Sequence, residues 1–455
     1  MIENDYPIIK PFISDGEFFV YDMYKNQIIK LPMGFVPEVN SIMQMGIKKY
    51  INQNKSTYEY NSILHLLDKG YFQSSHIDNV EFPYKNKATT IASRCLRHMV
   101  LQVTKRCNFK CRYCSYAVSE FSRNHESVDM NWECAKKSID FFLNHSMDAK
   151  VVMLSFYGGE PLLNFDLIKK SIEYAEQIFK NKKILYSMTC NGSLLTEEYI
   201  NFLEKYNVGI TISLDGPESI QNRNRKFYLS GAGTYDVVSK NVLSIKKRHG
   251  EYFGEYVTFN PVLINGEDLR QVHDYFENTL HVSKEKVSPK YADLSGIDYI
   301  HPVSFTQDKN EDNTSISLER TQNRMAMHDN ISTTYCHGGP CIPGFTKLFV
   351  NTEGKFYLCE KVNELNKVYE LGNIDEGYNK AAINKLYDIV KLTEKRCKTC
   401  WQMRLCDVCA ADCGASNSDG FSYEQKMMKC NNQGNMLISH FKRIVKTEEK
   451  KCKDS

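Results

Sequence analysis

Residues 107–114 read Cys-Asn-Phe-Lys-Cys-Arg-Tyr-Cys and come shortly after the β-prone run Met99-Val-Leu-Gln-Val-Thr. Cys107, Cys111 and Cys114 therefore stand together on a loop at the end of an expected strand. Three neighbouring thiolates can hold a cubane 4Fe-4S cluster and leave its fourth iron without a protein ligand. Such an iron can bind a small molecule, so the loop predicts a reactive iron–sulfur site. The alternatives are structural thiols or a zinc site, which commonly uses four protein ligands in separated pairs.

Downstream of this loop, further β-prone runs each end in a polar or glycine-rich motif. The runs 151–157, 184–189, 208–213 and 256–263 lead into Gly158-Gly-Glu-Pro, Cys190-Asn-Gly, Leu214-Asp-Gly-Pro and Asn265-Gly. Helix-length segments lie at about 131–146, 165–180, 196–206, 233–249 and 267–279. Repeated strand–helix–strand segments predict parallel strands with right-handed crossovers. The motifs would then share the carboxyl edge of one sheet, where ligands bind.

The segment before this repeat has another pattern. Residues 1 to about 90 combine β-prone runs at 18–24 and 27–31 with helical stretches at 37–52 and 58–67. Strands followed by helices in so short a segment predict a winged-helix-like module. The alternative is a helical extension that packs on the main domain.

The segments after the repeat are more polar. Residues 280–332 are irregular, with a short helix expected near 318–327. The last stretch, 442–455, is charged and is expected to fray.

Length and composition limit the class of protein. A chain of 455 residues is long enough for about three domains. Its 58 basic and 55 acidic residues give a net charge of +3, which provides no strong field for nucleic acid or an anionic membrane. No apolar signal region follows the first ten residues and no run is long enough to span a bilayer, so we expect a soluble cytoplasmic protein.

The 16 cysteines are unevenly distributed. In a cytoplasmic protein they indicate metal binding rather than disulfides. Nine crowd the last third of the chain: Cys336, Cys341, Cys359, Cys397, Cys400, Cys406, Cys409, Cys413 and Cys430. This concentration predicts a second metal-binding region. Four others are expected to be small buried side chains or free thiols: Cys95, Cys134, Cys190 and Cys452.

The C-x3-C-x2-C loop, with Tyr113 before its last cysteine, resembles that of the radical S-adenosylmethionine (SAM) enzymes, and residues 98–265 resemble their barrel. The resemblance implies an α/β fold with a partial (β/α)6 TIM-type barrel. It also implies that Cys107, Cys111 and Cys114 hold a 4Fe-4S cluster whose open iron binds SAM. Reductive cleavage of SAM in this family gives methionine and a 5′-deoxyadenosyl radical, which abstracts a hydrogen atom from the substrate.

The same resemblance assigns cofactor-binding residues to successive strand ends. They are Tyr113, Gly158, Gly159, Glu160, Thr189, Asn191, Ser213, Asp215 and Arg225. The glycines would permit close approach to the ligand, and Glu160 would accept hydrogen bonds from the ammonium group of SAM. Residues after the third and fourth strands would face its ribose or methionine, and Arg225, with Arg223 as a rival, its carboxylate. Each polar residue could instead be a helix cap or turn residue.

The C-terminal cysteines resemble the SPASM extension of that family. Cys341, Gly354 and Cys359 give the pattern C-x12-G-x4-C, and a C-x2-C-x5-C run begins at Cys397. The resemblance implies an inner 4Fe-4S cluster held by Cys336, Cys341, Cys359 and Cys413. It implies an outer one held by Cys397, Cys400, Cys406 and Cys430. Cys409 is one cysteine more than the pattern and could replace Cys413 or stay free.

A zinc ribbon competes for residues 397–413, but its cysteine pairs usually lie about 15–20 residues apart. Only five residues separate Cys400 from Cys406.

Glu360 follows Cys359 at a position where some SPASM relatives place a general base. The alternative for Glu360 is an exposed surface residue.

The whole chain therefore resembles a radical SAM/SPASM peptide maturase. Its expected domains are a precursor recognition element at 1–92, the barrel at 93–315, the auxiliary-cluster domain at 316–441 and a charged tail at 442–455. The recognition element would bind a precursor's leader peptide by strand addition to its edge strand. The expected cofactors are three 4Fe-4S clusters and SAM, and the expected partners are a ribosomal precursor peptide and a reductant such as flavodoxin or ferredoxin, without nucleic acid or membrane.

The expected reaction is hydrogen abstraction from the precursor followed by crosslinking. Cys359-Glu-Lys and Cys397-Lys-Thr-Cys-Trp resemble maturases of cysteine-rich precursors, which favours a thioether. A carbon–carbon crosslink is the second choice. Two different classes of protein compete with a crosslinking enzyme. One is an anaerobic sulfatase maturase, whose relatives generally begin near the barrel, and the other is a multi-cluster electron carrier, which would not need Gly158-Gly-Glu-Pro.

Overall fold

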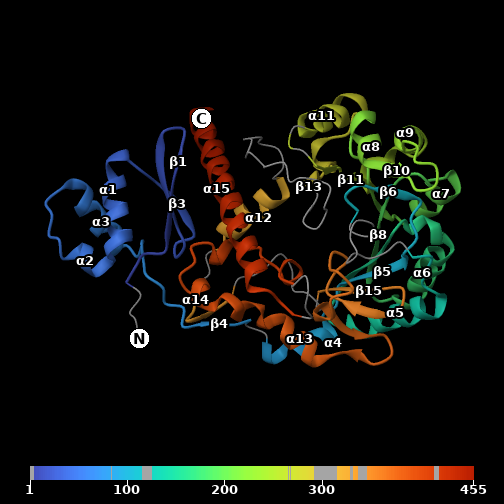
Figure 1. Cartoon of the computed structure of the whole chain (residues 1–455), viewed down its shortest axis with the longest axis horizontal. Coiled ribbons are helices and arrows are strands. Elements are labelled where there is room, and N and C mark those ends of the chain that lie inside the picture. Colours follow the sequence, from blue (N-terminus) through green and yellow to red (C-terminus); the bar gives the residue numbers. More distant parts are fainter. Residues whose placement is uncertain are drawn as a thin grey trace. The chain divides into compact units, whose positions relative to one another are not determined.

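A computed structural model describes residues 5–82, 85–114, 126–264, 266, 268–291, 315–327, 331–336, 346–414 and 420–454 (Figure 1). The chain divides into two compact units. Unit 1 comprises Met1–Asn86, Thr314–Cys341 and Asn384–Ser455, and unit 2 comprises Lys87–Asn313 and Ile342–Ile383. The expected Cys341 lies outside the described residues.

Unit 2 contains the sheet that the strand–helix repeat predicts. Its five expected strands are β5 (His98–Thr104), β7 (Val151–Gly158), β8 (Lys183–Cys190), β9 (Gly209–Ile212) and β11 (Val257–Phe259). They are hydrogen-bonded in the order β11-β9-β8-β7-β5, and every pair is parallel. This arrangement confirms the predicted α/β fold and is consistent with a partial (β/α)6 barrel.

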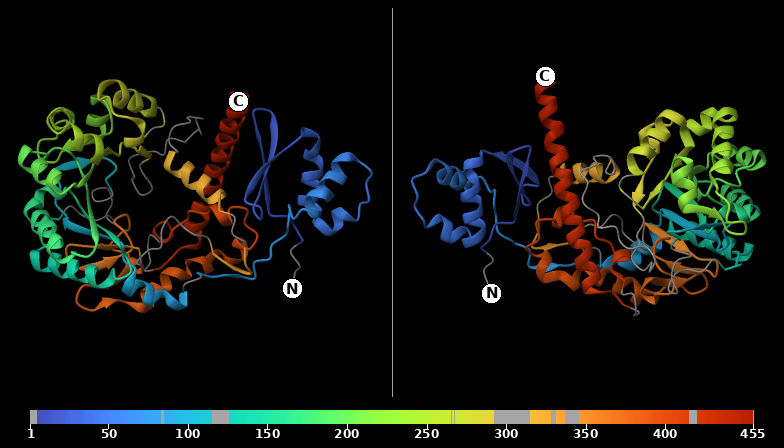
Figure 2. Two further views of the ribbon diagram at one scale, coloured as in Figure 1. Left: turned by 180° about the vertical axis from the view of Figure 1, so that it is seen from behind. Right: turned by 45° about the horizontal axis from the view of Figure 1, so that its top comes forward.

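The crossover helices lie where the sequence predicts them, on the outer side of the curved sheet (Figure 2). They are α5 (Trp132–His145), α6 (Phe165–Ile178), α7 (Glu197–Lys205), α9 (Tyr235–Arg248) and α11 (Asp268–Asp274). Asn131 and Thr196 cap α5 and α7 by accepting backbone N–H groups. Leu154 and Phe156 of β7 and Phe142 of α5 are buried in the core of the unit.

The sheet continues beyond β5 into residues that come much later in the chain. β15 (Lys347–Val350) pairs in parallel with β5, and β16 (Lys355–Tyr357), β17 (Glu370–Asn373) and β18 (Gly377–Tyr378) follow it in antiparallel fashion. β15 therefore pairs the edge of β5 that the five-strand repeat leaves open. The domain boundaries expected at 93–315 and 316–441 remain a proposal.

Unit 1 contains a three-stranded antiparallel sheet, β1 (Ile9–Ser14), β2 (Glu17–Asp22) and β3 (Gln27–Leu31), in that order. Its helices are α1 (Val36–Met45), α2 (Ile47–Ile51), α3 (Tyr58–Asp68), α12 (Ser315–Met325) and α15 (Tyr423–Asp454). Phe18 and Val20 of β2 share a core with α1 and α3, whereas Phe19 and Tyr21 share one with α15. The sheet is thus covered by helices on both faces.

Two features of unit 1 differ from the sequence prediction. The prediction does not include β1, because Pro11 interrupts its β-prone pattern; proline is tolerated there since β1 is an edge strand. Residues 442–454, expected to fray, instead continue α15, and Ile444 and Val445 are buried in its core with the sheet. Charge alone suggests a solvated tail, but the apolar residues recur at helical spacing.

Shorter elements complete the described chain: α4 (Ala88–Arg94), α8 (Glu218–Asn224), α10 (Gly250–Tyr256), α13 (Lys380–Tyr387), α14 (Glu394–Cys397), β4 (Asn79–Val80), β6 (Phe109–Cys111), β10 (Arg225–Phe227), β12 (Val262–Leu263), β13 (Lys290–Tyr291) and β14 (Thr334–Tyr335). Among the described residues, no helix is both long and apolar enough to cross a membrane.

Candidate functional site

The cysteine loop leaves β5 and returns through β6, which pairs with β10. Cys107 Sγ accepts the backbone N–H of Phe109 at 3.4 Å, and the backbone N–H of Cys114 donates to the carbonyl of Cys111 at 3.2 Å. Burial raises the pKa of the Cys107 thiol, and the negative charges of Glu160, Cys111 and Cys114 raise it further. The three thiols are therefore close enough to influence one another, as a shared metal cluster requires.

The Gly158-Gly-Glu turn touches the backbone of that loop. The N–H of Gly159 donates to the Thr104 carbonyl at 3.1 Å, and the N–H of Glu160 donates to the Arg106 carbonyl at 2.8 Å. A Cβ at Gly159 would lie 2.2 Å from the Arg106 oxygen, and one at Gly158 would lie 2.1 Å from the Thr104 oxygen. The glycines are needed because two strand ends meet, and this contact is in addition to the expected approach of a ligand.

Glu160 connects the second and third strand ends. Its buried carboxylate accepts the backbone N–H of Leu162 at 3.1 Å and that of Asn191 at 2.6 Å. Burial raises the pKa of this carboxyl to about 7, against the opposing effect of the two N–H groups. Glu160 is thus held in place before any ligand binds, and its remaining lone pairs are available to a cationic group.

Asn191 then joins the third strand end to the cysteine loop. Its Nδ2 donates to Asn108 Oδ1 at 2.7 Å, and its Oδ1 accepts the Ser193 hydroxyl at 2.7 Å. Asn108 Nδ2 donates back to Ser193 Oγ at 2.9 Å, which closes a ring of amide and hydroxyl groups. Thr189 is half-buried on β8, and the buried Ser213 donates its N–H to the Cys190 carbonyl at 2.8 Å.

Asp215 gathers three groups beside the cysteine loop. It accepts Arg225 Nη2 at 3.1 Å, the N–H of Val262 at 2.9 Å and the Tyr113 hydroxyl. Arg225 also places Nη1 3.9 Å from Cys111 Sγ, and its guanidinium lies 5.3 Å from the centre of the Tyr113 ring. Its rival Arg223 is 38% exposed and pairs with Asp268. Arg225 rather than Arg223 therefore lies with the cysteines.

Several buried polar atoms at this edge have no hydrogen-bond partner in the described part of the chain. They are Arg225 Nε and both amide atoms of Asn224. Buried polar groups are normally paired, so these atoms can serve a bound ligand. Three thiols and unpaired polar groups together fit an iron–sulfur cluster with a small polar ligand. In the described residues no three metal-binding side chains already stand at coordinating positions, so a metal would draw the thiols together.

A bidentate ion pair and a hydrogen bond fix the chain just before Cys107. Arg106 donates to both carboxylate oxygens of Asp129, through Nε at 2.9 Å and through Nη2 at 2.6 Å. The same carboxylate accepts the Thr104 hydroxyl at 2.5 Å. Bidentate pairs of this kind set direction as well as contributing energy. The sequence prediction missed Asp129, because no sequence pattern connects this residue with the cysteine motif.

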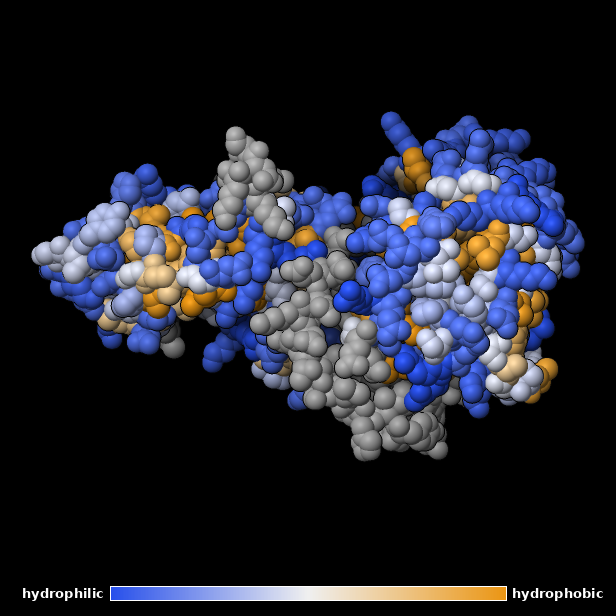
Figure 3. Space-filling view, turned by 90° about the horizontal axis from the view of Figure 1, so that it is seen from above, coloured by the Kyte–Doolittle hydropathy of each residue, from blue (hydrophilic) through white to orange (hydrophobic). Residues whose placement is uncertain are grey.

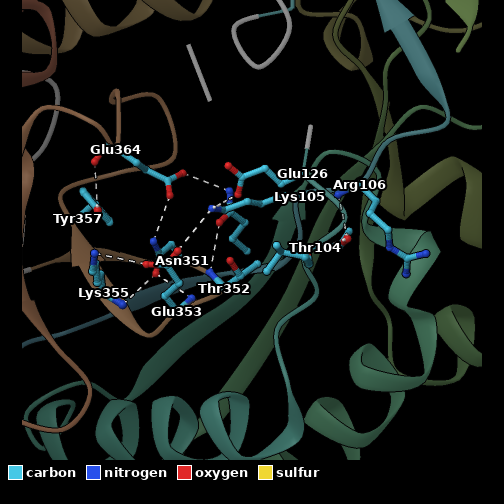
Figure 4. Close-up of polar contacts among 12 residues, drawn as sticks. Thr104, Lys105, Arg106, Glu126, Asn351, Thr352, Glu353, Lys355, Tyr357 and Glu364 are labelled. Atoms are coloured by element: carbon cyan, nitrogen blue, oxygen red, sulfur yellow. Dashed lines mark hydrogen bonds and ion pairs between the residues drawn. The ribbon is translucent and has the colours of Figure 1, made fainter. Parts of the chain in front are cut away.

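A second network joins β5 to the turn between β15 and β16 (Figure 4). Buried Gln102 donates to Glu364 at 3.1 Å and accepts the backbone N–H of Thr352 at 3.2 Å, and Asn351 also donates to Glu364 at 3.2 Å. Gly354 ends this turn with φ +80, a conformation that favours glycine. The turn therefore explains the glycine of the C-x12-G-x4-C pattern.

Polar side chains also follow β5, β7 and β8 toward the opposite edge of the sheet. His98 Nε2 lies 2.7 Å from Ser155 Oγ, which lies 2.6 Å from Ser187 Oγ. Glu360 pairs with Lys347 at 2.7 Å, and its side chain is only 18% exposed, so it is not an exposed surface residue. Burial raises the pKa of Glu360, but Lys347 outweighs this effect and leaves that pKa below its usual value.

The expected outer cysteines lie together in unit 1. Cys397 ends α14, Cys400 and Cys406 follow it, and Cys430 is on α15. Burial raises the pKa of Cys400 to about 11, and the thiols of Cys397 and Cys430 act in the same direction. Burial also raises the pKa of Cys406, and the thiols of Cys400, Cys430 and Cys397 raise it further.

The expected inner set is less complete. Buried Cys413 packs with Cys406 and Cys430, and its Sγ donates to the Cys409 carbonyl at 3.2 Å. Burial raises the pKa of Cys336, Lys426 opposes that rise, and the thiol of Cys397 adds to it, so Cys336 lies near Cys397. Cys341 is outside the described residues and Cys359 belongs to unit 2, so this ligand set stays a prediction.

Known proteins resemble this chain over the region of the site. Residues 101–278 match the Radical SAM superfamily. An uncharacterized protein of Methanocaldococcus jannaschii is 36% identical over 123 residues, 27% of this chain and 40% of that protein. A radical SAM cyclopropyl synthase of Paramaledivibacter caminithermalis is 28% identical over 197 residues, 41% of this chain and 38% of that protein. The chain thus spans about two fifths of the length of these two relatives.

A third relative aligns over a longer region. A cysteine-type anaerobic sulfatase-maturating enzyme of Clostridium perfringens is 28% identical over 341 residues, 69% of this chain and 88% of that protein. The solved structure of native anSMEcpe with bound AdoMet and Kp18Cys peptide is 21% identical, covers 76% of this chain and 99% of that chain, and has a TM-score of 0.54. This likeness supports the fold. Residues 101–278 are therefore a radical SAM domain, and the chain is similar to a cyclopropyl synthase and to sulfatase-maturating enzymes.

Proposed function

We propose that this enzyme modifies a ribosomally made precursor peptide, with a 4Fe-4S cluster and SAM at the cysteine loop and two auxiliary clusters in a SPASM extension. The observation that carries the proposal is the grouping of Cys397, Cys400, Cys406 and Cys430 in the same unit as an N-terminal three-stranded sheet. A radical SAM domain alone would need neither feature. An inner cluster on Cys336, Cys341, Cys359 and Cys413 completes the proposal, with Cys409 as the alternative to Cys413.

At the cysteine loop we assign roles to the buried residues around it. Glu160 would accept the ammonium group of SAM, and Asn191 and Ser213 would face its ribose. Arg225, held by Asp215, would meet its carboxylate and offset the negative charge of the thiolates. The support is geometric: Glu160, Asn191 and Ser213 are buried and follow consecutive strands of the sheet, and buried Arg225 lies opposite Cys111 on the β6–β10 ribbon.

The N-terminal sheet would bind the leader of the precursor as an added strand. Of its two edge strands, β1 contains Pro11, which lacks an N–H, so β3 is the better template. Met33 follows β3 with 51% exposure, and Tyr58 opens α3 with 74% exposure. Figure 3 shows hydrophobic residues gathered over the module that Figure 1 labels α1, α3 and β1. Such residues can supply pockets for the side chains of the added strand.

The first choice of reaction is a thioether crosslink in a cysteine-rich precursor. A carbon of the precursor would lose a hydrogen atom to the 5′-deoxyadenosyl radical. The sulfur would lose its proton and bond to that carbon, and the one electron released would pass to an auxiliary cluster. A carbon–carbon crosslink would have the same loss of two hydrogen atoms.

An anaerobic sulfatase maturase is the second candidate, and the match to the Clostridium perfringens enzyme over most of its length favours it. A cysteine would then become formylglycine, in which an aldehyde oxygen replaces the thiol sulfur. The N-terminal sheet favours the precursor instead, because a sheet with an open edge strand can bind a leader peptide by strand addition.

The test is mass spectrometry of candidate substrates after incubation with reconstituted enzyme, SAM and a reductant. A short cysteine-rich peptide encoded beside the gene should lose two hydrogen atoms, and its crosslink should be located by fragmentation. A sulfatase peptide converted to the aldehyde would instead establish the second candidate. If no reductant yields 5′-deoxyadenosine, the cofactor assignment is wrong.

The ligand assignment has its own experiment. Cys107→Ala, Cys111→Ala and Cys114→Ala together should abolish 5′-deoxyadenosine formation and leave iron at the C-terminal cysteines. Loss of all iron from this triple variant would indicate one shared site instead of three.

A further inference from the structure

The β6–β10 ribbon has two unlike faces. The strands are antiparallel, with Arg225 opposite Cys111, Lys226 opposite Lys110 and Phe227 opposite Phe109 (Figure 1). Both strands show the pattern buried, exposed, half-buried, so the face that carries Cys111 and Arg225 points inward. The other face, with Lys110 and Lys226, points to solvent. Among the residues that the structure describes, a single layer of backbone therefore separates the candidate cluster from solvent here.

The outer face is positively charged. Lys110, Arg112 and Lys226, which we call the basic patch, are all exposed. In the described chain none of the three forms an ion pair or a side-chain hydrogen bond. Like charges placed directly opposite each other on paired strands are destabilising, so the repulsion between Lys110 and Lys226 lowers the stability of the folded protein. A negatively charged partner would remove that cost.

The tip of the same ribbon is apolar and exposed. Tyr228 is 58% exposed and Leu229 is 95% exposed. The tip is tied to the cysteine loop, because the Tyr228 N–H donates to the Asn108 carbonyl at 2.8 Å. Exposed aromatic and aliphatic residues flanked by charge are typical of protein interfaces, where the apolar part supplies affinity and the charge steers approach.

We propose that the basic patch and the 228–229 tip form the docking surface for an acidic one-electron donor protein of the flavodoxin type. The proposal rests on the cluster assigned to Cys107, Cys111 and Cys114. Docking here would bring the donor against the backbone of Cys111. In the transfer one electron leaves the donor and enters the cluster; no bond is made or broken in that step.

The test compares two reductants of opposite charge. SAM cleavage by wild-type enzyme and by the double variant Lys110→Glu/Lys226→Glu is measured once with a reduced acidic flavodoxin and once with reduced methyl viologen, a small cation. We expect the ratio of flavodoxin-driven to viologen-driven rate to fall about tenfold or more in the variant. Lys150→Glu/Lys170→Glu, which changes the charge equally at two exposed lysines elsewhere in unit 2, should keep the wild-type ratio.

Salt gives an independent measure in the unchanged protein. The Debye length falls from about 30 Å at 0.01 M salt to about 3 Å at 1 M. The flavodoxin-driven rate of the wild type should therefore decrease with salt more steeply than the viologen-driven rate. If the double glutamate variant loses iron, Lys110→Gln/Lys226→Gln removes the charges without reversing them and should lower the same ratio.

Three results would overturn the proposal: an unchanged ratio in both patch variants, an equal fall in the Lys150/Lys170 control, or equal salt dependence of the two reductants. Failure of the radical SAM assignment is a separate outcome, because the wild-type enzyme would then give no 5′-deoxyadenosine with methyl viologen.

Discussion

Gly159 is the residue at which the second strand end and the cysteine loop come closest. A Cβ there would meet two backbone oxygens, at 2.2 Å from Arg106 and 2.8 Å from Lys105. Backbone cannot move aside as a flexible side chain can, so Gly159→Ala should displace the loop that carries Cys107. We expect a loss of about 1–3 kcal/mol in the free energy of unfolding of the metal-free protein, the usual cost of overpacking.

Urea unfolding and iron analysis check this expectation. Iron bound at the cysteine loop should fall with stability in Gly159→Ala. Gly254 provides the matched control, because a Cβ on it meets nothing within 4 Å. Gly254→Ala should keep the iron content, and full iron in Gly159→Ala would show that the loop tolerates the shift.

His98 should make stability depend on pH. Burial, together with a smaller effect of Lys347, lowers its pKa to about 4. In the unfolded chain the imidazole has a pKa of about 6.5, so below that pH the unfolded state binds a proton that the folded state does not. The contribution of His98 is therefore present above about pH 6.5 and is lost as pH falls toward 4. The loss is at most about 3 kcal/mol.

His98→Gln removes the titration while keeping a group that can bond Ser155. Between neutral pH and about pH 4.5, the metal-free wild type should lose about 2 kcal/mol more stability than this variant. His65, exposed on α3, provides the control His65→Gln, which should follow the wild type. Parallel curves for wild type and His98→Gln would mean that His98 titrates normally.

At this scale the sequence predicts the residues inside motifs and misses their partners. Cys107, Glu160 and Asp215 stand in recognisable patterns at strand ends. Asn108 contacts Asn191, and Asp129 contacts Thr104, only through folding, because hydrogen bonds between different strand ends leave no spacing in the sequence. The only hint for Asn108 is its place inside the cysteine loop.

At the scale of elements, the β6–β10 ribbon carries an unfavourable pair whose removal should stabilise the protein. Lys226→Glu would face Lys110 with an opposite charge. Opposite-charge pairs on facing strands contribute about 0.2–1 kcal/mol. Urea unfolding of the metal-free variant should show a gain of that size, together with the slower flavodoxin-driven reaction.

A gain in stability with a loss of electron uptake would separate the two roles of Lys226. Lys170→Glu, on the exposed surface of α6, has no such facing lysine and should change neither quantity. If Lys226→Glu instead lowered stability, the two lysines would not be repelling each other.

The elements that the sequence predicts are those with long, regular patterns. The five parallel strands and their helices follow from apolar runs separated by turn residues. β1 contains Pro11, which breaks its β-prone pattern. β15–β18 are short, and β15 pairs with a strand far away in the chain, so this pairing cannot be predicted from the local sequence pattern. For the same reason, the sequence does not predict that the barrel sheet extends past β5.

At the scale of the whole molecule, the N-terminal module is not an independent domain. The sheet residues Phe12 and Tyr21 share one core with Phe441 of α15 and with Leu405. Residues 1–86 and 384–455 consequently belong to one unit, although some 300 residues of sequence lie between them. Domain boundaries are predicted from the sequence where its composition changes. A core built from both ends of the chain causes no such change in composition. Deleting 1–86 would therefore expose part of α15 as well as remove the proposed recognition element.

Phe441 connects this shared core to the expected outer cluster. Its ring lies 4.7 Å from Tyr21 and 6.0 Å from Trp401, the neighbour of Cys400, and α15 itself carries Cys430. Phe441→Ala should cost about 3–5 kcal/mol in the unfolding of unit 1, as large-to-small core changes do. Because two of the four expected ligands are attached to that core, iron at the outer site should fall as well.

The effect of Phe441→Ala on bound iron is best measured in the triple Cys107, Cys111 and Cys114 alanine variant, because all iron that remains there is bound at the auxiliary sites. Met428, 45% exposed on the same helix, supplies the control Met428→Ala, which should keep both iron and stability. Loss of iron with Phe441→Ala but not with Met428→Ala would mean that the N-terminal sheet and the outer cluster stabilise each other through α15. Iron that stays in place while the core of the sheet unfolds would mean that the sheet and the outer cluster fold independently, and the proposed recognition element could then be removed without harm to the clusters.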